Sequence, residues 1–302
     1  QRVWLIRCLE QEYILKAVSF PLHETEFIIR AMAHLKDGGF HDFNEIIPTK
    51  TGEDIVEYQG KYYFLSHRIS GTESNYKDTE KIKLCAEFLG EFHKRSGGYK
   101  ALDPYPGRVK WGNWPNIFSE KKRDIGEFKE IAQNEEEFDI LYRRFCPYFI
   151  QAIEETEERI KRSKYKELCR EEQEHGGFCH HDLAHHNFII GERVNIIDFD
   201  YIIADIRCHD LSNFISKVLK ANDWDAEKAK IALSCYDRVN PLKDGETEAL
   251  KIMLRFPQDF WQCGLARYSE GDISAHNTIK LKRLLKQRNL RSEALKELDK
   301  SI

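Results

Sequence analysis

The chain has 302 residues, of which 41% are hydrophobic and 32% charged, as expected for a globular protein with an ample core. Its formal net charge of −4 argues against a nucleic-acid-binding surface, which would show as a basic patch. We find no apolar run of about eighteen residues and no charged-then-apolar leader, so we expect no membrane span and no secretory signal. The 8 cysteines are widely spaced without a Cys-x-x-Cys pair, which predicts reduced, mostly buried thiols and synthesis in the cytoplasm.

Residues 1–70 are predicted to form a small β-rich lobe. Two β-type runs, at residues 3–6 and 13–18, open the chain on either side of a polar turn. A helix is expected to begin at Pro21 and to end at a glycine pair, because apolar residues recur there at helical spacing. This expected stripe consists of Phe27, Ile28, Ala31, Met32 and Leu35. A hairpin is predicted between residues 54 and 65, and the last five residues of the lobe are expected to form a hinge.

Residues 71–302 are predicted to form a larger, mostly helical lobe. The first buried helical face is expected at Leu84, Phe88, Leu89 and Phe92. A loop rich in Pro, Gly and Trp, at 103–115, precedes a long helical stretch from 117 to about 164. A strand, turn and strand at 188–197 interrupt the helices, which resume at Leu211. The predicted fold class is therefore α+β, with a small β-rich N-lobe and a large α-helical C-lobe.

The most informative segment begins with a loop at residues 180–187, followed by an apolar hairpin that ends in a carboxylate. Phosphoryl transfer needs such an arrangement: Asp182 would accept the proton of an attacking hydroxyl, and Asn187 and Asp198 would hold magnesium on the nucleotide phosphates. The order His-x-Asp-x-x-x-x-Asn, strand, turn, strand-Asp is typical of protein-kinase-like folds. The alternative for each residue is ordinary loop, cap or strand-end chemistry.

The sequence around this segment resembles the aminoglycoside phosphotransferase and choline kinase superfamily. Within it, the chain is most similar to the CotS-type spore coat proteins of spore-forming bacteria, a kinase-like family. The matching stretches are residues 178–190, 197–201 and 210–214, together with Tyr13-Ile14-Leu15-Lys16, Trp111, Trp114 and Phe256-Pro257. The resemblance implies a two-lobed protein-kinase-like fold with ATP and Mg²⁺ as cofactors. It also implies a small hydroxylated substrate, other spore coat proteins as partners, and a location in the spore coat.

The resemblance also assigns nucleotide-binding residues in the N-lobe. Lys16 would hold the α- and β-phosphates, with Glu26 as its acidic partner and Glu24 as the second choice. The alternative for Lys16 is a surface lysine on an edge strand. Backbone groups of the hinge would contact adenine, and the residues concerned are Ser66, His67 and Ile69. No glycine precedes Gly38, so the expected Gly-rich phosphate-covering loop is missing. Either it lies upstream of the sequence given, or the phosphates are held less tightly.

Two further aspartates have open roles. Protein kinases usually carry glycine two residues after the magnesium-binding aspartate, whereas this chain has Asp200, and choline kinases also carry an acidic residue there. Asp200 is either a second metal ligand, within the metal-binding hairpin at 188–200, or a solvated side chain. Asp210 is similar to the family aspartate that braces the catalytic loop, here residues 180–187, through backbone hydrogen bonds. It is also a candidate helix N-cap before Leu211.

Three alternative functions can be weighed against the sequence. Zinc binding by His181 and His185 would need a helix, which the strand beginning after Asn187 makes improbable. A metal-dependent phosphohydrolase is disfavoured because that class is all-helical around its metal, whereas a hairpin is predicted here at residues 188–197. The stronger rival to a phosphotransferase is a spore coat structural protein that has a kinase fold and little or no catalysis, because fold alone does not settle function.

Overall fold

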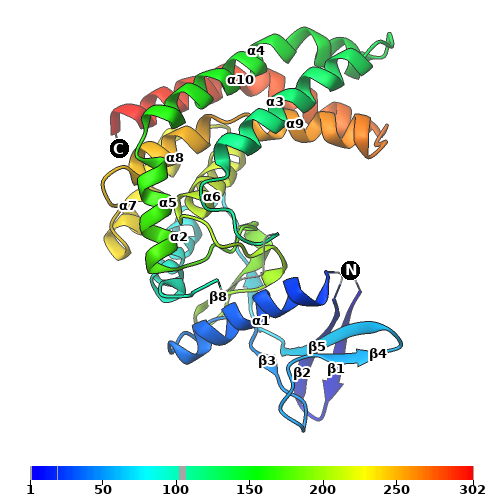
Figure 1. Ribbon diagram of the computed structural model, residues 1–302, viewed down its shortest axis with the longest axis vertical. Helices are drawn as coiled ribbons and strands as arrows, with labels where there is room; N and C mark the ends of the chain where they lie inside the picture. The colour runs from blue at the N-terminus through cyan, green and yellow to red at the C-terminus, as the bar shows by residue number, and fades with distance from the viewer. Residues whose placement is uncertain (1, 19, 102–106, 302) are drawn as a thin grey trace.

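The computed structural model describes residues 2–18, 20–101 and 107–301, arranged as a small sheet-bearing lobe and a larger helical lobe (Figure 1). The N-terminal sheet has the order β1-β2-β5-β3, with β4 also paired to β5, and all of its pairs are antiparallel. Its strands are β1 (Val3–Cys8), β2 (Gln11–Ala17), β3 (Ile46–Ile47), β4 (Val56–Tyr58) and β5 (Lys61–His67). The register places Lys16 opposite Val3 on one side and Phe64 on the other. The two early strands and the predicted hairpin are therefore confirmed.

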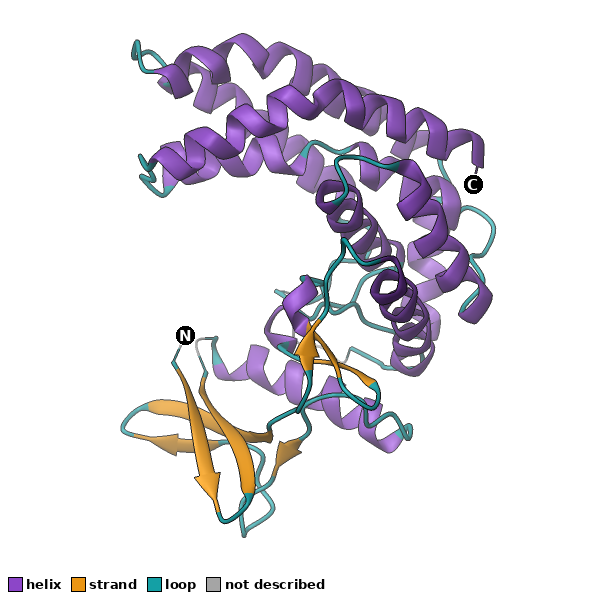
Figure 2. Ribbon diagram, turned by 180° about the vertical axis from the view of Figure 1, so that it is seen from behind, coloured by secondary structure: helices purple, strands orange, loops and turns teal. Residues whose placement is uncertain are grey.

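The helix α1 (Leu22–Asp37) lies between this sheet and the helical lobe (Figures 1 and 2). Pro21 precedes its first turn, where a missing N–H costs no helical hydrogen bond. All five residues of the predicted stripe are buried. Its Phe27 ring contacts Tyr99 edge-to-face at 5.5 Å, so α1 packs on the C-lobe core rather than serving the N-lobe alone.

The chain changes sheets directly after β5. Strand β6 (Thr72–Glu73) pairs with β7 (Phe188–Ile190), which pairs with β8 (Val194–Ile196), so the predicted strand–turn–strand segment is confirmed. Gly71 has φ +148°, and a Cβ there would meet the Ile190 carbonyl oxygen at 2.7 Å. Only glycine permits such a close approach of two backbones. This crossing fixes the path between the two lobes.

The helical lobe contains nine α-helices among the described residues: α2 (Thr79–Ser96), α3 (Trp114–Ile131), α4 (Glu137–Arg162), α5 (Tyr165–His175), α6 (Cys208–Ala221), α7 (Ala226–Val239), α8 (Glu246–Arg255), α9 (Gln258–Gly264) and α10 (Ala275–Ser301). Shorter turns are η1 (His185–Asn187), η2 (Phe199–Tyr201) and the π-helical η3 (Leu265–Ser269). The helices α3, α4, α9 and α10 form an arm that projects away from the N-lobe (Figure 1). No described helix is long and apolar enough to cross a membrane.

Three sequence expectations are wrong in detail. The stretch 117–164 is not one helix, because the chain leaves helical geometry between Ile131 and Glu137 and turns back so that α4 packs on α3. Leu89 and Phe92 are buried as expected, but Leu84 is 43% exposed, since positions four apart drift around a helix and Cys85 takes its place on the buried face of α2. The helices resume at Cys208, not Leu211.

Two apolar clusters make up the core. One joins α1, α2, α6 and α7 to the hairpin β7–β8, and the other joins α3, α4, α8, α9 and α10. All eight cysteines are free, and every one except Cys8 is buried, which confirms the predicted buried thiols. The candidate site described next lies where these clusters meet the hairpin.

Candidate active site

The loop before η1 holds Asp182 through its neighbour His180. The His180 ring is fully buried, accepts the Asp182 N–H at Nδ1 (3.3 Å) and therefore donates from Nε2 to the Ile197 carbonyl oxygen (3.1 Å). Desolvation lowers the pKa of His180, so its ring is neutral at physiological pH. This histidine ties the loop to the end of the hairpin, as expected for a structural rather than a metal-binding residue.

The Asp182 carboxylate has one partner on each oxygen. Lys217 donates to Oδ1 at 3.0 Å, and the Asn187 side-chain amide donates to Oδ2 at 3.0 Å. Burial would raise the pKa of Asp182, but the hydrogen bond and charge of Lys217 outweigh it and hold that pKa below the ordinary value. Asp182 is therefore ionised at neutral pH, which is the state that can accept a hydroxyl proton.

Asp210 braces this loop from α6. Its buried carboxylate accepts the backbone N–H groups of His180 (2.6 Å) and His181 (2.7 Å), and the Nε2–H of His93 (3.1 Å). Burial opposes the charge, yet the hydrogen bond from His93 and the other donors hold the Asp210 pKa at about 2. Asp210 lies inside α6, whose N-cap is Arg207, so the N-cap alternative is wrong and the bracing geometry is present.

Two non-glycine residues of the site have left-handed backbone conformations. His181 has φ +68° and Asp198 has φ +69°, a conformation that costs of order 1–3 kcal/mol and persists only where the surroundings enforce it. The bond from Asp210 to the His181 N–H is part of that enforcement. His181 and His185 do not share a helix, so the geometry that a helical zinc pair needs is absent from this loop.

Lys16 meets the two aspartates that follow β8. Its Nζ lies 2.6 Å from Asp198 Oδ1 and 2.6 Å from Asp200 Oδ1, and its side chain is only 12% exposed. Burial raises the pKa of Asp200 despite the charge of Lys16. Two carboxylates converging on one cation form the hard oxygen donor set that Mg²⁺ prefers, so these residues fit the predicted ion. Lys16 is thus not a surface lysine on an edge strand.

Asn187 connects the loop at residues 180–187 to the Lys16 cluster, by which we mean Lys16, Asp198 and Asp200. Its side-chain amide donates to the Asp182 carboxylate and to the Asp182 backbone carbonyl oxygen (2.9 Å). The backbone carbonyl oxygen of Asn187 accepts the Ile197 N–H at 2.9 Å. Ile197 is the residue directly before Asp198. One backbone hydrogen bond and two bonds donated by the Asn187 side chain therefore hold the loop with Asp182 against the end of the hairpin before Asp198.

The structure does not bring Glu26 to Lys16. Glu26 lines a shallow hollow between α1 and the β4–β5 hairpin, together with Arg30 of α1 and Tyr62 of β5. No ion pair in the described part of the chain joins Glu26 to Lys16. Positions two apart point to different sides of a helix, and it is Glu24 that faces inward. There it forms an ion pair with Arg108 at 2.8 Å.

Arg108 is a site residue that the sequence did not indicate. It is 4% exposed, and its guanidinium donates to the Asp200 carbonyl oxygen at 2.6 Å. It thereby links α1 to η2 through Glu24. Arg108 belongs to the segment 103–115, whose Pro, Gly and Trp content predicts only a loop. Nothing in that local pattern distinguishes this arginine from one exposed to solvent.

The expected hinge residues lie at the junction of the two sheets. Ser66 is fully buried within β5, and the His67 N–H donates to the Glu45 carbonyl oxygen at 3.0 Å. Ile69 lies between β5 and β6 and is half-buried. Contact between these residues and adenine stays a prediction, as do the nucleotide and metal roles of the residues above.

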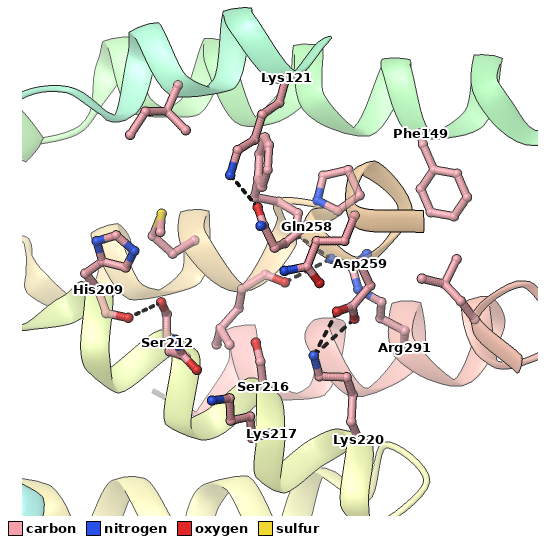
Figure 3. A pocket seen from close by; sticks show the side chains of 18 of the residues that line it. Lys121, Phe149, His209, Ser212, Ser216, Lys217, Lys220, Gln258, Asp259 and Arg291 are labelled. Carbon is pink, nitrogen blue, oxygen red and sulfur yellow. Dashed lines mark hydrogen bonds and ion pairs between the residues drawn. The ribbon is translucent and has the colours of Figure 1, made fainter. Parts of the chain in front are cut away.

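A cavity of about 1210 Å³ opens on the other side of Asp182. Its walls come mainly from α3, α6, α9 and α10, and Figure 3 shows Lys220 of α6 facing Asp259, with Arg291 beside them. Asp182 is part of its lining, whereas Lys16 and Asp198 are not. The catalytic aspartate candidate therefore stands between the Lys16 cluster and a space large enough for a small organic molecule.

Comparisons with known proteins show which family and fold this chain is similar to. Spore coat protein S of Bacillus subtilis (strain 168) is 28% identical over 274 residues, covering 89% of this chain and 77% of the relative. An aminoglycoside phosphotransferase structure from Alicyclobacillus acidocaldarius is 20% identical with a TM-score of 0.84, covering 96% of this chain and 86% of that one. A spectinomycin phosphotransferase structure is 13% identical with a TM-score of 0.69, covering 98% and 89%. Choline kinases and an amicoumacin kinase are further solved structures with this fold.

These similarities confirm the protein-kinase-like, two-lobed α+β fold and the resemblance to CotS-type proteins. The family model described as "Spore coat putative kinase YutH" matches residues 5–298, which is nearly the whole chain. The protein therefore belongs to that family of kinase-like spore coat proteins.

Proposed function

We propose that the protein transfers the γ-phosphate of ATP to a hydroxyl group of a small metabolite. The observation that carries this proposal is the position of Asp182. Its ionised carboxylate lines the cavity on one side and is held through Asn187 to the Lys16–Asp198–Asp200 cluster on the other. A base placed between an acceptor space and a phosphate-binding cluster is what in-line phosphoryl transfer requires.

Each residue then has a distinct task. Asp182 orients the acceptor hydroxyl and takes its proton, which its lowered pKa permits at neutral pH. Asn187, Asp198 and Asp200 are the residues that would hold Mg²⁺, and the ion would neutralise charge on the phosphates. Lys16 already lies against two of those carboxylates and would hold the α- and β-phosphates. Asp210 keeps the loop in place.

Nucleotide complexes of proteins with the same fold support this reading. The spectinomycin phosphotransferase was solved with ADP and spectinomycin, and the amicoumacin kinase with AMP-PNP and Ca²⁺. Both ligand sets pair an adenine nucleotide with a small acceptor or a divalent ion, as proposed here. Since identity to them is low, their acceptors are not carried over to this chain.

The second candidate is a coat assembly protein with little or no catalysis. The similarity to spore coat protein S favours it, and location in the spore coat with other coat proteins as partners is common to both candidates. Under this alternative the site residues persist for folding alone. The ionised state and cavity-facing position of Asp182 favour the enzyme, because folding alone gives no reason for a carboxylate there.

Incorporation of labelled phosphate from ATP into a metabolite extract tests the proposal. The original protein is compared with Asp182→Asn, which keeps the shape of the side chain but cannot accept the proton. Signal that falls by orders of magnitude in the variant supports the enzyme. Equal background in both proteins, with Asp182→Asn still assembled into spores, supports the coat protein instead. Thermal unfolding with ATP and Mg²⁺ confirms that both proteins remain folded and bind nucleotide.

A further inference from the structure

The cavity beside Asp182 carries a charge opposite to that of the whole molecule. Nine of its lining residues are lysine or arginine and three are carboxylates, whereas the chain has 47 basic and 51 acidic residues and a net charge of −4. A concave, partly desolvated surface with one sign of charge concentrates ligands of the other sign. The excess is thus a property of this cavity and not of the protein surface in general.

Most of these cations form no ion pair with a carboxylate in the described part of the chain. Within the described residues, Lys217 pairs with Asp182 and Lys220 with Asp259, and the other seven form no ion pair. Asp259 interacts with more than one cation. Burial raises the pKa of this carboxyl, whereas the positive charges of Lys220, Lys280 and Arg291 lower it. A single carboxylate thus faces several positive charges.

The cations come from facing helices at regular spacing. On α10, Lys280, Arg283, Gln287 and Arg291 recur every three or four residues and form one stripe along the cavity. Arg283 donates to the Lys220 carbonyl oxygen at 3.3 Å, which joins this stripe to α6. We call Lys220, Lys280, Arg283 and Arg291 the α6–α10 cation cluster.

Two arginines of this cluster hold helices together, and two members are exposed. Arg291 donates to the carbonyl oxygens of Leu254, Arg255 and Phe256, so it ties α10 to the end of α8. Lys280 and Arg283 are exposed on α10 and form no ion pair with a carboxylate in the part of the chain that the structure describes. The bond from Arg283 to a backbone carbonyl oxygen joins two helices but leaves its positive charge without a carboxylate partner.

The cluster lies close to the proposed base. Lys217 contacts Asp182, and Lys220 is three residues farther along α6, a rise of about 4.5 Å. An acceptor whose hydroxyl meets Asp182 would therefore place groups a few bonds away against Lys220 and its neighbours. Lysine and arginine bind phosphate and carboxylate groups by charge-assisted hydrogen bonds.

We propose that the acceptor is an anionic hydroxylated metabolite, a phosphorylated or carboxylated sugar or polyol, whose negative groups bind the α6–α10 cation cluster. This inference rests on the proposed phosphotransferase function and specifies the substrate class of the same site. It excludes cationic acceptors, because an amine or quaternary ammonium would have to lie among nine cations that only three carboxylates offset.

The test separates a metabolite extract of a spore-forming bacterium by ion exchange into anionic, neutral and cationic pools before ATP is added. Each pool is incubated with the intact protein, Mg²⁺ and labelled ATP. Transfer mainly to the anionic pool is expected, and elution of that acceptor with a phosphate or a carboxylate standard identifies its negative group. Transfer mainly to the neutral or cationic pool overturns this inference and leaves the proposed function standing. Transfer to no pool overturns the proposed function itself.

Variants then locate the binding groups. With the purified anionic acceptor, Lys280→Gln and Arg283→Gln should each lower kcat/KM about ten- to hundredfold, mostly through KM, as expected for loss of one charge-assisted hydrogen bond. Lys286→Gln is the matched control, because Lys286 is an exposed lysine of α10 that does not line the cavity. Equal KM values for all three variants and the original protein would refute the role of the cluster.

Discussion

Replacing Asp210 with asparagine tests how the catalytic loop is held. The carboxylate accepts two backbone N–H groups at 2.6 and 2.7 Å and the His93 ring at 3.1 Å. Asparagine has one acceptor oxygen, so its NH₂ group must face one of these buried donors. An unpaired buried donor costs about 1–3 kcal/mol. The shift of the Asp210 pKa from 3.8 to about 2 gives a similar value, about 2 kcal/mol at 1.36 kcal/mol per unit.

The same shift predicts a pH dependence. Because the folded-state pKa of Asp210 lies below its ordinary value, the stabilisation is fully present above about pH 4 and is lost as the pH falls to about 2. Urea unfolding should therefore show the original protein about 2 kcal/mol more stable than Asp210→Asn at neutral pH, with the difference shrinking toward pH 2. Turnover should also fall, by about a hundredfold, because a small displacement of Asp182 disturbs in-line geometry.

Asp139→Asn is the control for a general loss of stability. Asp139 is also buried and accepts the Tyr268 hydroxyl at 2.9 Å, but it lies near the start of α4, outside the catalytic loop. Asp139→Asn should lose stability but keep its turnover, when turnover is measured well below the melting temperatures of both variants. The reasoning is refuted if Asp210→Asn unfolds like the original protein at neutral pH, or if both variants lose turnover equally.

Three further outcomes are expected. Asp198→Ala should abolish the magnesium-dependent stabilisation by ATP, which is about 2.7 kcal/mol at an ATP concentration a hundred times Kd. Asp182→Asn should keep this stabilisation, as measured by calorimetry. Equal loss in both variants would contradict the assignment of Asp198 to the metal and Asp182 to the acceptor. EDTA should weaken ATP binding to the original protein, and unchanged affinity would argue against a metal site. Burial lowers the pKa of Lys121 to about 8, against the opposing charges of Asp124 and Glu120. Acceptor KM should therefore rise above pH 8 as Lys121 loses its proton, and Lys121→Arg should remove this rise; the same rise in both would show that another group titrates.

The order of residues around the catalytic loop could be predicted because its chemistry is local. Asp182, Asn187 and Asp198 lie within seventeen residues on a loop and a hairpin, and the structure joins these segments by hydrogen bonds of the Asn187 side chain and backbone. The buried stripe on α1 could be predicted as well, because apolar residues on one helical face recur every three or four positions in the sequence. Lys16 was found by resemblance, and its β-strand position is confirmed.

The partner of Lys16 could not be predicted from local sequence in this way. Glu26 and Glu24 differ only in which side of α1 they occupy, and that depends on how the helix is rotated against the C-lobe. The observed partners of Lys16 are 182 and 184 residues away in the chain. No local pattern carries that information, because contacts between distant segments are set by packing of whole elements.

The sequence by itself determined the elements, the catalytic loop and the family resemblance, since each depends on residues close together in the chain. Only the tertiary structure decided which charges face the acceptor. Lys121, Lys220 and Lys280 lie on α3, α6 and α10, each among ordinary surface charges of an amphipathic or mixed helix. Their common sign matters only after the helices enclose one cavity, because electrostatic interaction depends on distance in space and on exclusion of water rather than on separation in sequence.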